Sequence, residues 1–297
     1  MYIKEALREL NLFNELPLEW KKSLDENGYF VVEKYFNDDV CQEMGDEFDR
    51  LHSLEGEQGG HEVHIEPTTK RISNIFNKTT IFDRCLNIEP LLSASHYMLG
   101  EFKIHGANLR EPKKNGGHQK IHVDVPKKFN DDWWVCNAII AIDEITLGNG
   151  PPRVIPGSHY WQTFNVAYVN IHDWVPEPLS DIEKSRIPKD LEAPYPGELH
   201  VSCPKGSVII INSALWHGGT CNKSGERRRV LHLTYTRRDL PQQLVQRQYL
   251  TSNLYDRLNR AQRFIMDIEP ISLEIESSLR MKSAGKKSAG DWWNPET

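Results

Sequence analysis

This chain of 297 residues has few cysteines and no excess of positive charge. It has only five cysteines, and no two of them form a CxxC pair (positions 41, 85, 136, 203 and 221). This odd, scattered set argues against a disulfide framework and against a thiolate zinc site. The 36 basic residues are outnumbered by 42 acidic ones, which gives a net charge of −6. Because nucleic acids are held by positive fields, we expect no nucleic-acid partner.

Long apolar runs are absent as well. No window approaches 18 consecutive apolar residues, so the sequence excludes a membrane-spanning helix. The opening MYIKEALRELNLF carries acidic side chains and lacks the apolar segment of a secretory signal. Together with the cysteine pattern, these features predict a cytoplasmic protein. Apolar residues still make up 38% of the chain and charged residues 26%, a balance typical of a folded core.

What the chain does contain is an early helical part and a later β-rich part. Residues 16–27, 38–51 and 81–99 have apolar side chains at helical spacing, and residues 27–36 are typical of a turn and a strand. Short β-rich runs follow from residue 100, separated by Gly, Pro and Asn: FKIHGANLR, HQKIHVDV, WWVCNAIIAID, GSVIIIN and RRRVLHLTYTRR. This order predicts a mainly β barrel or sandwich that carries helices on one side.

We expect a single domain over residues 1–297, because neither an interdomain linker nor a long repeat interrupts the sequence. Its core would occupy about residues 20–240. The weakly periodic segment of about 160–200 predicts an insertion that covers a pocket like a lid. Residues 241–276 are expected to form a helical extension, and residues 277–297, with KSAGKKSAG, a mobile tail.

His122-Val123-Asp124 is the short motif with the clearest chemical meaning. Residues i and i+2 of a strand point to the same face, so one imidazole and one carboxylate converge there. His217 lies 95 residues further on, directly after the buried-strand pattern GSVIIINSALW. Two imidazoles and one carboxylate form the facial triad that leaves open positions on Fe(II). An HxD pair also occurs by chance, so an ordinary surface pair remains the alternative for this motif alone.

Arg228 follows His217 by eleven residues, at the start of another strand pattern. Alternation places one set of side chains toward the barrel interior: Arg228, Val230, His232 and Thr234. On the other face, apolar residues would pack against helices, while Arg227 and Arg229 would be solvated. A buried guanidinium requires an anion, and a dicarboxylic cosubstrate would supply a fork-shaped one. A salt bridge to Asp143 or Glu144 is the alternative.

Taken together, the motifs resemble the phytanoyl-CoA dioxygenase family of Fe(II)/2-oxoglutarate-dependent oxygenases. The matching pieces occur in the order NGYFVVEKYFNDDV, QKIHVD, the NG turn leading to PGSH, and WHGG followed by Arg228. They span about residues 20–240. The resemblance implies a double-stranded β-helix, a cupin-like jelly roll with flanking helices. It also implies Fe(II) as cofactor, 2-oxoglutarate as cosubstrate, and O2 and a small molecule as substrates.

In this resemblance, His122, Asp124 and His217 match the catalytic iron ligands, and Arg228 matches the arginine that binds the distal carboxylate of 2-oxoglutarate. Related halogenases have Gly or Ala at the carboxylate position, which makes room for chloride. Because Asp124 fills this position, the resemblance implies hydroxylation or a related oxidation of an unactivated C–H bond, with release of succinate and CO2. No pattern in the sequence ties the substrate to a CoA thioester.

Further polar residues are candidates for the pocket. Asn137 lies on the strand after the HxD motif, where family members often place a polar cosubstrate contact. Gln119 matches a polar, pocket-facing position three residues before His122, although strict alternation requires a bulge to bring it there. Asn108 and Arg110 share one face of the preceding strand, and surface hydrogen bonding is their alternative. Of the tryptophans, those in the insertion are the better pocket candidates, at positions 161 and 174.

Two other functions remain open on the sequence alone. One is a jelly roll that has lost turnover and serves as a metal-binding sensor or binding protein. The other is a cupin-like enzyme that uses Mn or Zn without a cosubstrate. Zinc favours a closed tetrahedral ligand set that often includes Cys, and no cysteine stands near the triad in sequence.

Overall fold

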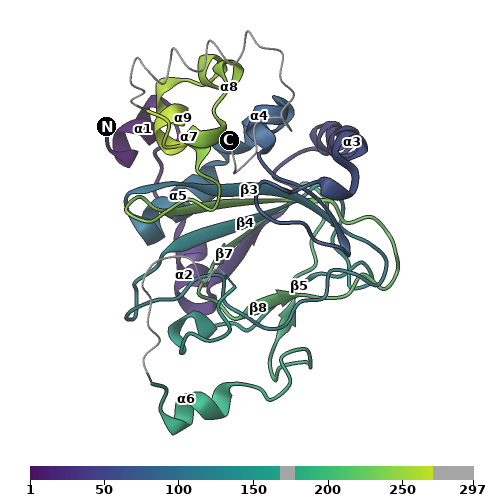
Figure 1. Cartoon of the computed structure of the whole chain (residues 1–297). Helices are drawn as coiled ribbons and strands as arrows, with labels where there is room; N and C mark the ends of the chain where they lie inside the picture. The colour runs from purple at the N-terminus through teal and green to yellow at the C-terminus, as the bar shows by residue number, and fades with distance from the viewer. Residues whose placement is uncertain (168–177, 270–297) are drawn as a thin grey trace.

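Two antiparallel sheets face each other at the centre of the molecule (Figure 1). This computed structural model describes residues 1–167 and 178–269. The larger sheet has six strands in the spatial order β1 (Tyr29–Val32), β7 (Val208–Asn212), β4 (Val135–Ala141), β9 (Val230–Arg237), β3 (Phe102–Pro112) and β2 (Thr69–Ile72). The smaller sheet has the order β6 (Leu199–His200), β5 (Pro152–Val154) and β8 (His217–Gly219). This architecture confirms the predicted jelly roll.

Helices lie on the outside of the larger sheet. They are α1 (Ile3–Glu9), α2 (Leu18–Asn27), α3 (Asp38–Glu55), α4 (Ile75–Lys78), α5 (Glu89–Leu99), α7 (Gln246–Tyr249), α8 (Ser252–Arg257) and α9 (Arg260–Ile265). Figure 1 shows α4, α8 and α9 on one side of this sheet and the short strands β5 and β8 on the other. The helices therefore leave the inner face of the larger sheet to the space between the two sheets.

The two faces of β9 have opposite character, as its alternating sequence predicts. Leu231, Leu233 and Tyr235 are fully buried in the main apolar core, which also contains apolar residues of α5. His232 and Thr234 point the other way and line a cavity. Because side chains alternate along a strand, one run of sequence both anchors the helices and builds the wall of the cavity.

Several elements differ from the sequence expectation. The run HQKIHVDV forms no continuous strand, and His122 makes only an isolated bridge with His217. The expected helix over 81–99 is a 3-10 segment (Ile81–Asn87) followed by α5, because Pro90 fits only the first turn of a new helix. Helix α1 and strand β2 were not expected, since both are too short to show a clear period in the sequence.

The predicted insertion of about 160–200 includes α6 (Asp181–Arg186), which stands apart from the barrel in Figure 1. Within the expected helical extension of 241–276, the described part contains the short helices α7, α8 and α9, and residues 270–276 lie outside the described residues. The expected tail of 277–297 lies outside the described residues, as does Trp174. The lid-like role of the insertion and the single-domain organisation stay predictions.

Two expectations from composition agree with the structure. All five cysteines are free thiols, and four of them are buried. Across residues 1–167 and 178–269, no helix combines the length and hydrophobicity needed to cross a bilayer.

Candidate active site

His122 and His217 are brought side by side by backbone pairing between two segments that are distant in sequence. The amide of each residue donates to the carbonyl of the other, at N···O distances of 2.9 and 3.0 Å. The two imidazole rings lie with their centroids 4.5 Å apart. Asp124 follows on the same side, because its amide donates to the carbonyl of Ser213. The predicted convergence therefore occurs, although a bridge and a turn produce it rather than a strand.

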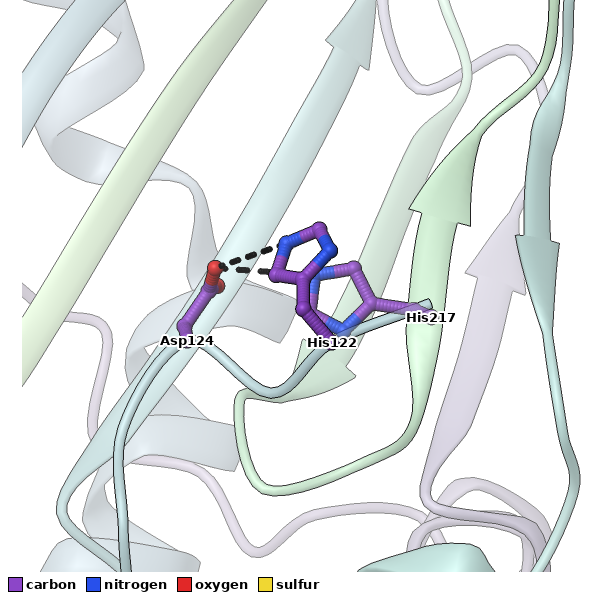
Figure 2. Close-up of side chains that lie close together, drawn as sticks. All are labelled: His122, Asp124 and His217. Carbon is purple, nitrogen blue, oxygen red and sulfur yellow. Dashed lines mark ion pairs between the residues drawn. The ribbon is translucent and has the colours of Figure 1, made fainter. Parts of the chain in front are cut away.

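Figure 2 shows the Asp124 carboxylate pointing toward both rings. Its Oδ1 lies 3.6 Å from Nε2 of His122 and 3.6 Å from Nε2 of His217. One ligand atom from each of the three residues lies within 4.8 Å of the others, and all three side chains are largely buried. At this spacing the three side chains could hold a single metal ion.

The orientation of each ring is fixed by a carbonyl two residues earlier in the chain. Nδ1 of His122 lies 2.8 Å from the oxygen of Lys120, and Nδ1 of His217 lies 2.7 Å from the oxygen of Leu215. A carbonyl oxygen can only accept, so each Nδ1 carries the proton and donates it. In the neutral ring, Nε2 then offers its lone pair, as metal-binding histidines do.

The electrostatics of the cluster favour an ionised Asp124. Burial alone would raise the pKa of this carboxyl, but the charge of His217 and hydrogen bonds from both imidazoles hold it well below its usual range. Burial alone would lower the pKa of His217. The nearby Asp124 carboxylate outweighs this effect of burial, so the pKa of the imidazole is raised. The cluster thus presents one anionic oxygen beside two imidazole nitrogens.

The three side chains open onto a cavity of about 230 Å³ between the sheets. The inner-face residues predicted for the last strand all line it: Arg228, Val230, His232 and Thr234. Asn108, Arg110, Gln119 and Asn137 line it as well. Trp161 does not: its ring packs edge-on against Trp216, with centroids 5.1 Å apart. Trp161, a better candidate for the pocket than most tryptophans, is thus not a pocket residue and has the packing role that is more usual for this residue type, in a separate aromatic cluster.

Arg228 is a buried guanidinium that no carboxylate of the described residues pairs with. Its residue is 7% exposed, its Nε has no hydrogen-bond partner, and it makes no ion pair within the part of the chain that the structure describes. Burial lowers the pKa of Arg228 to about 10, with a further contribution from the charge of Arg110. The group is therefore charged at neutral pH. Asp143 pairs with Arg229 instead, which removes one alternative partner for Arg228.

Of the two neighbouring arginines, Arg227 is exposed as expected, and Arg229 is not. Arg229 is 8% exposed and binds Asp143 and Asp49, with N···O distances of 2.7 and 3.1 Å. Arg227 is more exposed, yet it binds both Asp49 and Glu111. The expectation was wrong for Arg229 because helix α3, which carries Asp49, lies over this residue.

Asn137 and Gln119 contact groups of the site in different ways. Nδ2 of Asn137 lies 3.5 Å from Oδ2 of Asp124, while its Oδ1 is buried without a partner in the described chain. Oε1 of Gln119 accepts a hydrogen bond from the amide of Gly219, at 3.0 Å. No strand is formed at residue 119, so the alternation that seemed to turn this side chain away does not apply.

A buried arginine of the smaller sheet forms hydrogen bonds both to the segment that precedes His122 and to the insertion. Arg153 is 2% exposed, and its Nη2 donates to the carbonyls of Gln119 and Leu191, both at 2.9 Å. Its Nη1 donates to the carbonyl of Ala193 at 3.0 Å. Charge-assisted bonds to several carbonyls hold these three chain segments in one arrangement.

Sequence reasoning missed a charged cluster in the wall of the cavity. Glu66 accepts from Arg71 and, at 2.6 Å, from Nη2 of Arg110, and it lies 3.1 Å from Nε2 of His64. Gln243 also lines the cavity. Strand β2, which carries Arg71, has only the four residues TKRI, and Glu66 lies in a loop. Neither segment has a period that would predict an inward-facing side chain.

We expect Glu66→Gln to destabilise the protein in a pH-dependent way. Burial would raise the pKa of Glu66, but the His64 contact and the charges of Arg110 and Arg71 hold it well below the ordinary 4.5. Because the folded-state pKa is depressed, the stabilisation is fully present above about pH 4.5 and is lost as the pH falls below it. At pH 7, removing one partner of this largely buried pair should cost about 3 kcal/mol of unfolding free energy.

Denaturant unfolding of both proteins at a series of pH values would measure this effect. The stability difference should shrink steadily below pH 4.5. Glu57→Gln is the matched control, since this exposed carboxylate pairs with Lys113 at the surface and should matter little at any pH. A Glu66→Gln difference that is the same at pH 7 and pH 3 would contradict the assignment.

Comparison with known proteins agrees with the geometry. The family model described as Phytanoyl-CoA dioxygenase (PhyH) matches residues 24–230. A phytanoyl-CoA dioxygenase domain-containing protein 1 homolog of Caenorhabditis briggsae is 30% identical over 172 residues, 57% of this chain and 54% of that protein. The chain thus spans about half the length of this relative. A probable alpha-ketoglutarate-dependent hypophosphite dioxygenase of Stutzerimonas stutzeri is 23% identical, over 74% of this chain and 79% of that protein.

Among solved structures, HygX from Streptomyces hygroscopicus with nickel and 2-oxoglutarate bound has a TM-score of 0.57 and 16% identity, covering 76% of this chain and 88% of that one. This likeness shows a shared fold. The residues present also fit the expected groups: two imidazole nitrogens and a carboxylate suit Fe(II), and the unpaired Arg228 suits a carboxylate. With most of its length matched by the family model, the chain belongs to the phytanoyl-CoA dioxygenase family, and it is a non-haem iron oxygenase that depends on 2-oxoglutarate.

Proposed function

We propose that the protein hydroxylates an unactivated C–H bond of a small molecule. In this reaction the substrate, O2 and 2-oxoglutarate are converted to hydroxylated product, succinate and CO2. The observation that carries the proposal is the convergence of His122, Asp124 and His217 in the wall of one cavity. Three ligands on one side of an iron ion leave positions for a chelating cosubstrate and for O2.

We propose that Arg228 binds the distal carboxylate of 2-oxoglutarate. The guanidinium is buried, charged, and lines the same cavity as the three ligands. The planar Arg228 guanidinium has no carboxylate partner among the described residues, so it suits the carboxylate of a bound cosubstrate. Asn137 and Gln119 stay proposed cosubstrate contacts, and the free Oδ1 of Asn137 supports the first of them.

Iron with its cosubstrate would supply the oxidising power, and the chain supplies position and surroundings. Asp124, ionised and buried, fills the coordination position that a halide would need. Ile139, Ile211 and Val230 add apolar side chains to the cavity wall, where the carbon skeleton of a substrate could pack. No observation favours the alternative of an inactive metal-binding protein, because the ligand set and the cosubstrate arginine are all in place. A cytoplasmic location and the lack of a nucleic-acid partner stay predictions from composition.

The mass of the product tests this function directly. Wild-type protein is supplied with Fe(II), 2-oxoglutarate, chloride, a metabolite mixture and ¹⁸O2. We expect a substrate whose mass rises by one labelled oxygen, with one succinate formed for each product. Asp124→Gly is the control and should form neither, because one anionic ligand is lost. A chlorinated product would overturn the hydroxylase proposal, and tight substrate binding without succinate would favour a sensor.

A further inference from the structure

A second guanidinium faces the cavity beside Arg228. Arg110 lies on β3, directly opposite Val230 in the register with β9, and therefore next to the strand that Arg228 precedes. Its one ion pair within the described chain is with Glu66, and its Nε is buried without a hydrogen-bond partner there. The guanidinium thus keeps donors that no protein acceptor uses.

Glu66 only partly compensates Arg110, because it is shared. Arg71 also binds Glu66, and Arg71 lies directly opposite Arg110 in the register of β2 with β3. Like charges at opposite positions of neighbouring strands repel each other. Glu66 is therefore shared by two guanidinium groups at this wall of the cavity.

The charges around the cavity do not balance. Three guanidinium groups line it, at positions 71, 110 and 228, against the two carboxylates of Glu66 and Asp124. A divalent metal and the dianion of 2-oxoglutarate would cancel each other, so one positive charge would remain. The positive charges also act on His232. Burial is the largest cause that holds the pKa of this imidazole well below its usual range, and the charges of Arg110 and Arg228 add to it.

The side chain next to Arg110 on the same face supplies an unused acceptor. Nδ2 of Asn108 donates to Oε1 of Gln243 at 2.9 Å, and its Oδ1 is buried with no partner in the described chain. Residues i and i+2 of a strand point the same way, so this oxygen and the Arg110 guanidinium face the same volume. Buried polar groups are costly unless a partner binds them.

We infer that Arg110 and Asn108 form a subsite for an anionic group of the main substrate, which is therefore a small organic acid. The inference rests on the proposed function. In it, Arg110 donates to the carboxylate of the acid, while Asn108 accepts from an adjacent hydroxyl or amino hydrogen. The acid lies against β3, and 2-oxoglutarate lies between the metal ligands and Arg228. The arrangement assigns one arginine to each of the two acids.

Calorimetric titration of the full chain can test the subsite without turnover. The protein is loaded with Mn(II) and saturating 2-oxoglutarate, so that Arg228 is occupied, and is titrated with hexanoate, hexyl phosphate and hexanamide. We expect hexanoate to bind at least about tenfold more tightly than the amide, since only the acid meets the guanidinium as a charged fork. Tighter binding of hexyl phosphate would support the anionic subsite and assign it to phosphate esters.

Arg110→Gln is the informative variant, because Glu66 keeps Arg71 as a partner and the cluster remains paired. It should weaken hexanoate about 30-fold or more while changing the affinity for 2-oxoglutarate less than about twofold. The matched control is Arg84→Gln, which removes an arginine paired with Glu43 at the surface. It should change neither affinity.

Two results would overturn the subsite. One is equal binding of the acids and the amide by wild-type protein, a comparison that holds even if the variant does not fold. The other is a loss of 2-oxoglutarate affinity in Arg110→Gln with no change for hexanoate, which would place Arg110 in the cosubstrate site. Failure of the proposed function looks different: wild-type protein would then show no metal-dependent binding of 2-oxoglutarate at all.

Discussion

Replacing His217 with alanine should abolish iron binding and turnover while the barrel stays folded. The imidazole contributes one of three ligand atoms that lie within 4.8 Å of one another, and the apolar cores of the sheets do not include it. Loss of groups that merely support a ligand typically costs about 10–100-fold, so the loss of a ligand itself should exceed 100-fold. Iron affinity by equilibrium dialysis and succinate formation would measure both effects.

His200→Ala is the matched control for His217→Ala. His200 belongs to the same small sheet, but its side chain is 40% exposed and lies beside Glu198 at the surface. Iron affinity and circular dichroism should equal those of the wild type. An active His217→Ala enzyme with full iron occupancy would contradict the assignment of the three ligands.

Replacing Arg228 with alanine should raise the concentration of 2-oxoglutarate required for binding by about 30-fold or more. A buried, charge-assisted contact of this kind contributes about 2–5 kcal/mol, because its loss leaves the cosubstrate carboxylate unpaired. Arg228→Lys should also be impaired, since an ammonium group cannot reproduce the planar fork. Binding of 2-oxoglutarate to the metal-loaded protein, followed by its visible charge-transfer absorption or by calorimetry, would measure the change.

The adjacent arginine provides the control for this experiment. Arg227 binds Asp49 and Glu111 away from the cavity, so Arg227→Ala should leave the affinity for 2-oxoglutarate unchanged. If Arg227→Ala raised the requirement for 2-oxoglutarate and Arg228→Ala did not, the cosubstrate would lie on the other face of the sheet.

The strands that build the cavity wall were predictable because their side chains alternate. In β9 the apolar residues Leu231 and Leu233 define the core face, and this fixes the direction of Arg228 and His232. The residue types then indicated a binding site, since a charged side chain on an inner face requires a partner of opposite charge. A β barrel or sandwich with helices on one side could thus be reached from local pattern, while the jelly roll and the full set of candidate ligands came from the resemblance to a known family.

Features that depend on contacts between distant segments were not predictable. The rings of His122 and His217 are oriented by backbone carbonyls, which carry no signature in the sequence. Glu66 lies in a loop, and its role becomes visible only when β2 pairs with β3. The expectation that Arg229 is solvated failed for the same reason, because helix α3 covers it from elsewhere in the chain.

The carbonyl contacts of Arg153 make two parts of the molecule mechanically dependent on each other. One guanidinium holds the oxygen of Gln119, three residues before His122, and the oxygens of Leu191 and Ala193 in the insertion. A shift of the insertion cannot occur without either breaking buried, charge-assisted bonds or pulling on the segment that carries His122. The amide of Ile121 also donates directly to the carbonyl of Leu191, at 2.9 Å, so a displacement of this part of the insertion would pull on the segment before His122 through the backbone as well as through the Arg153 side chain.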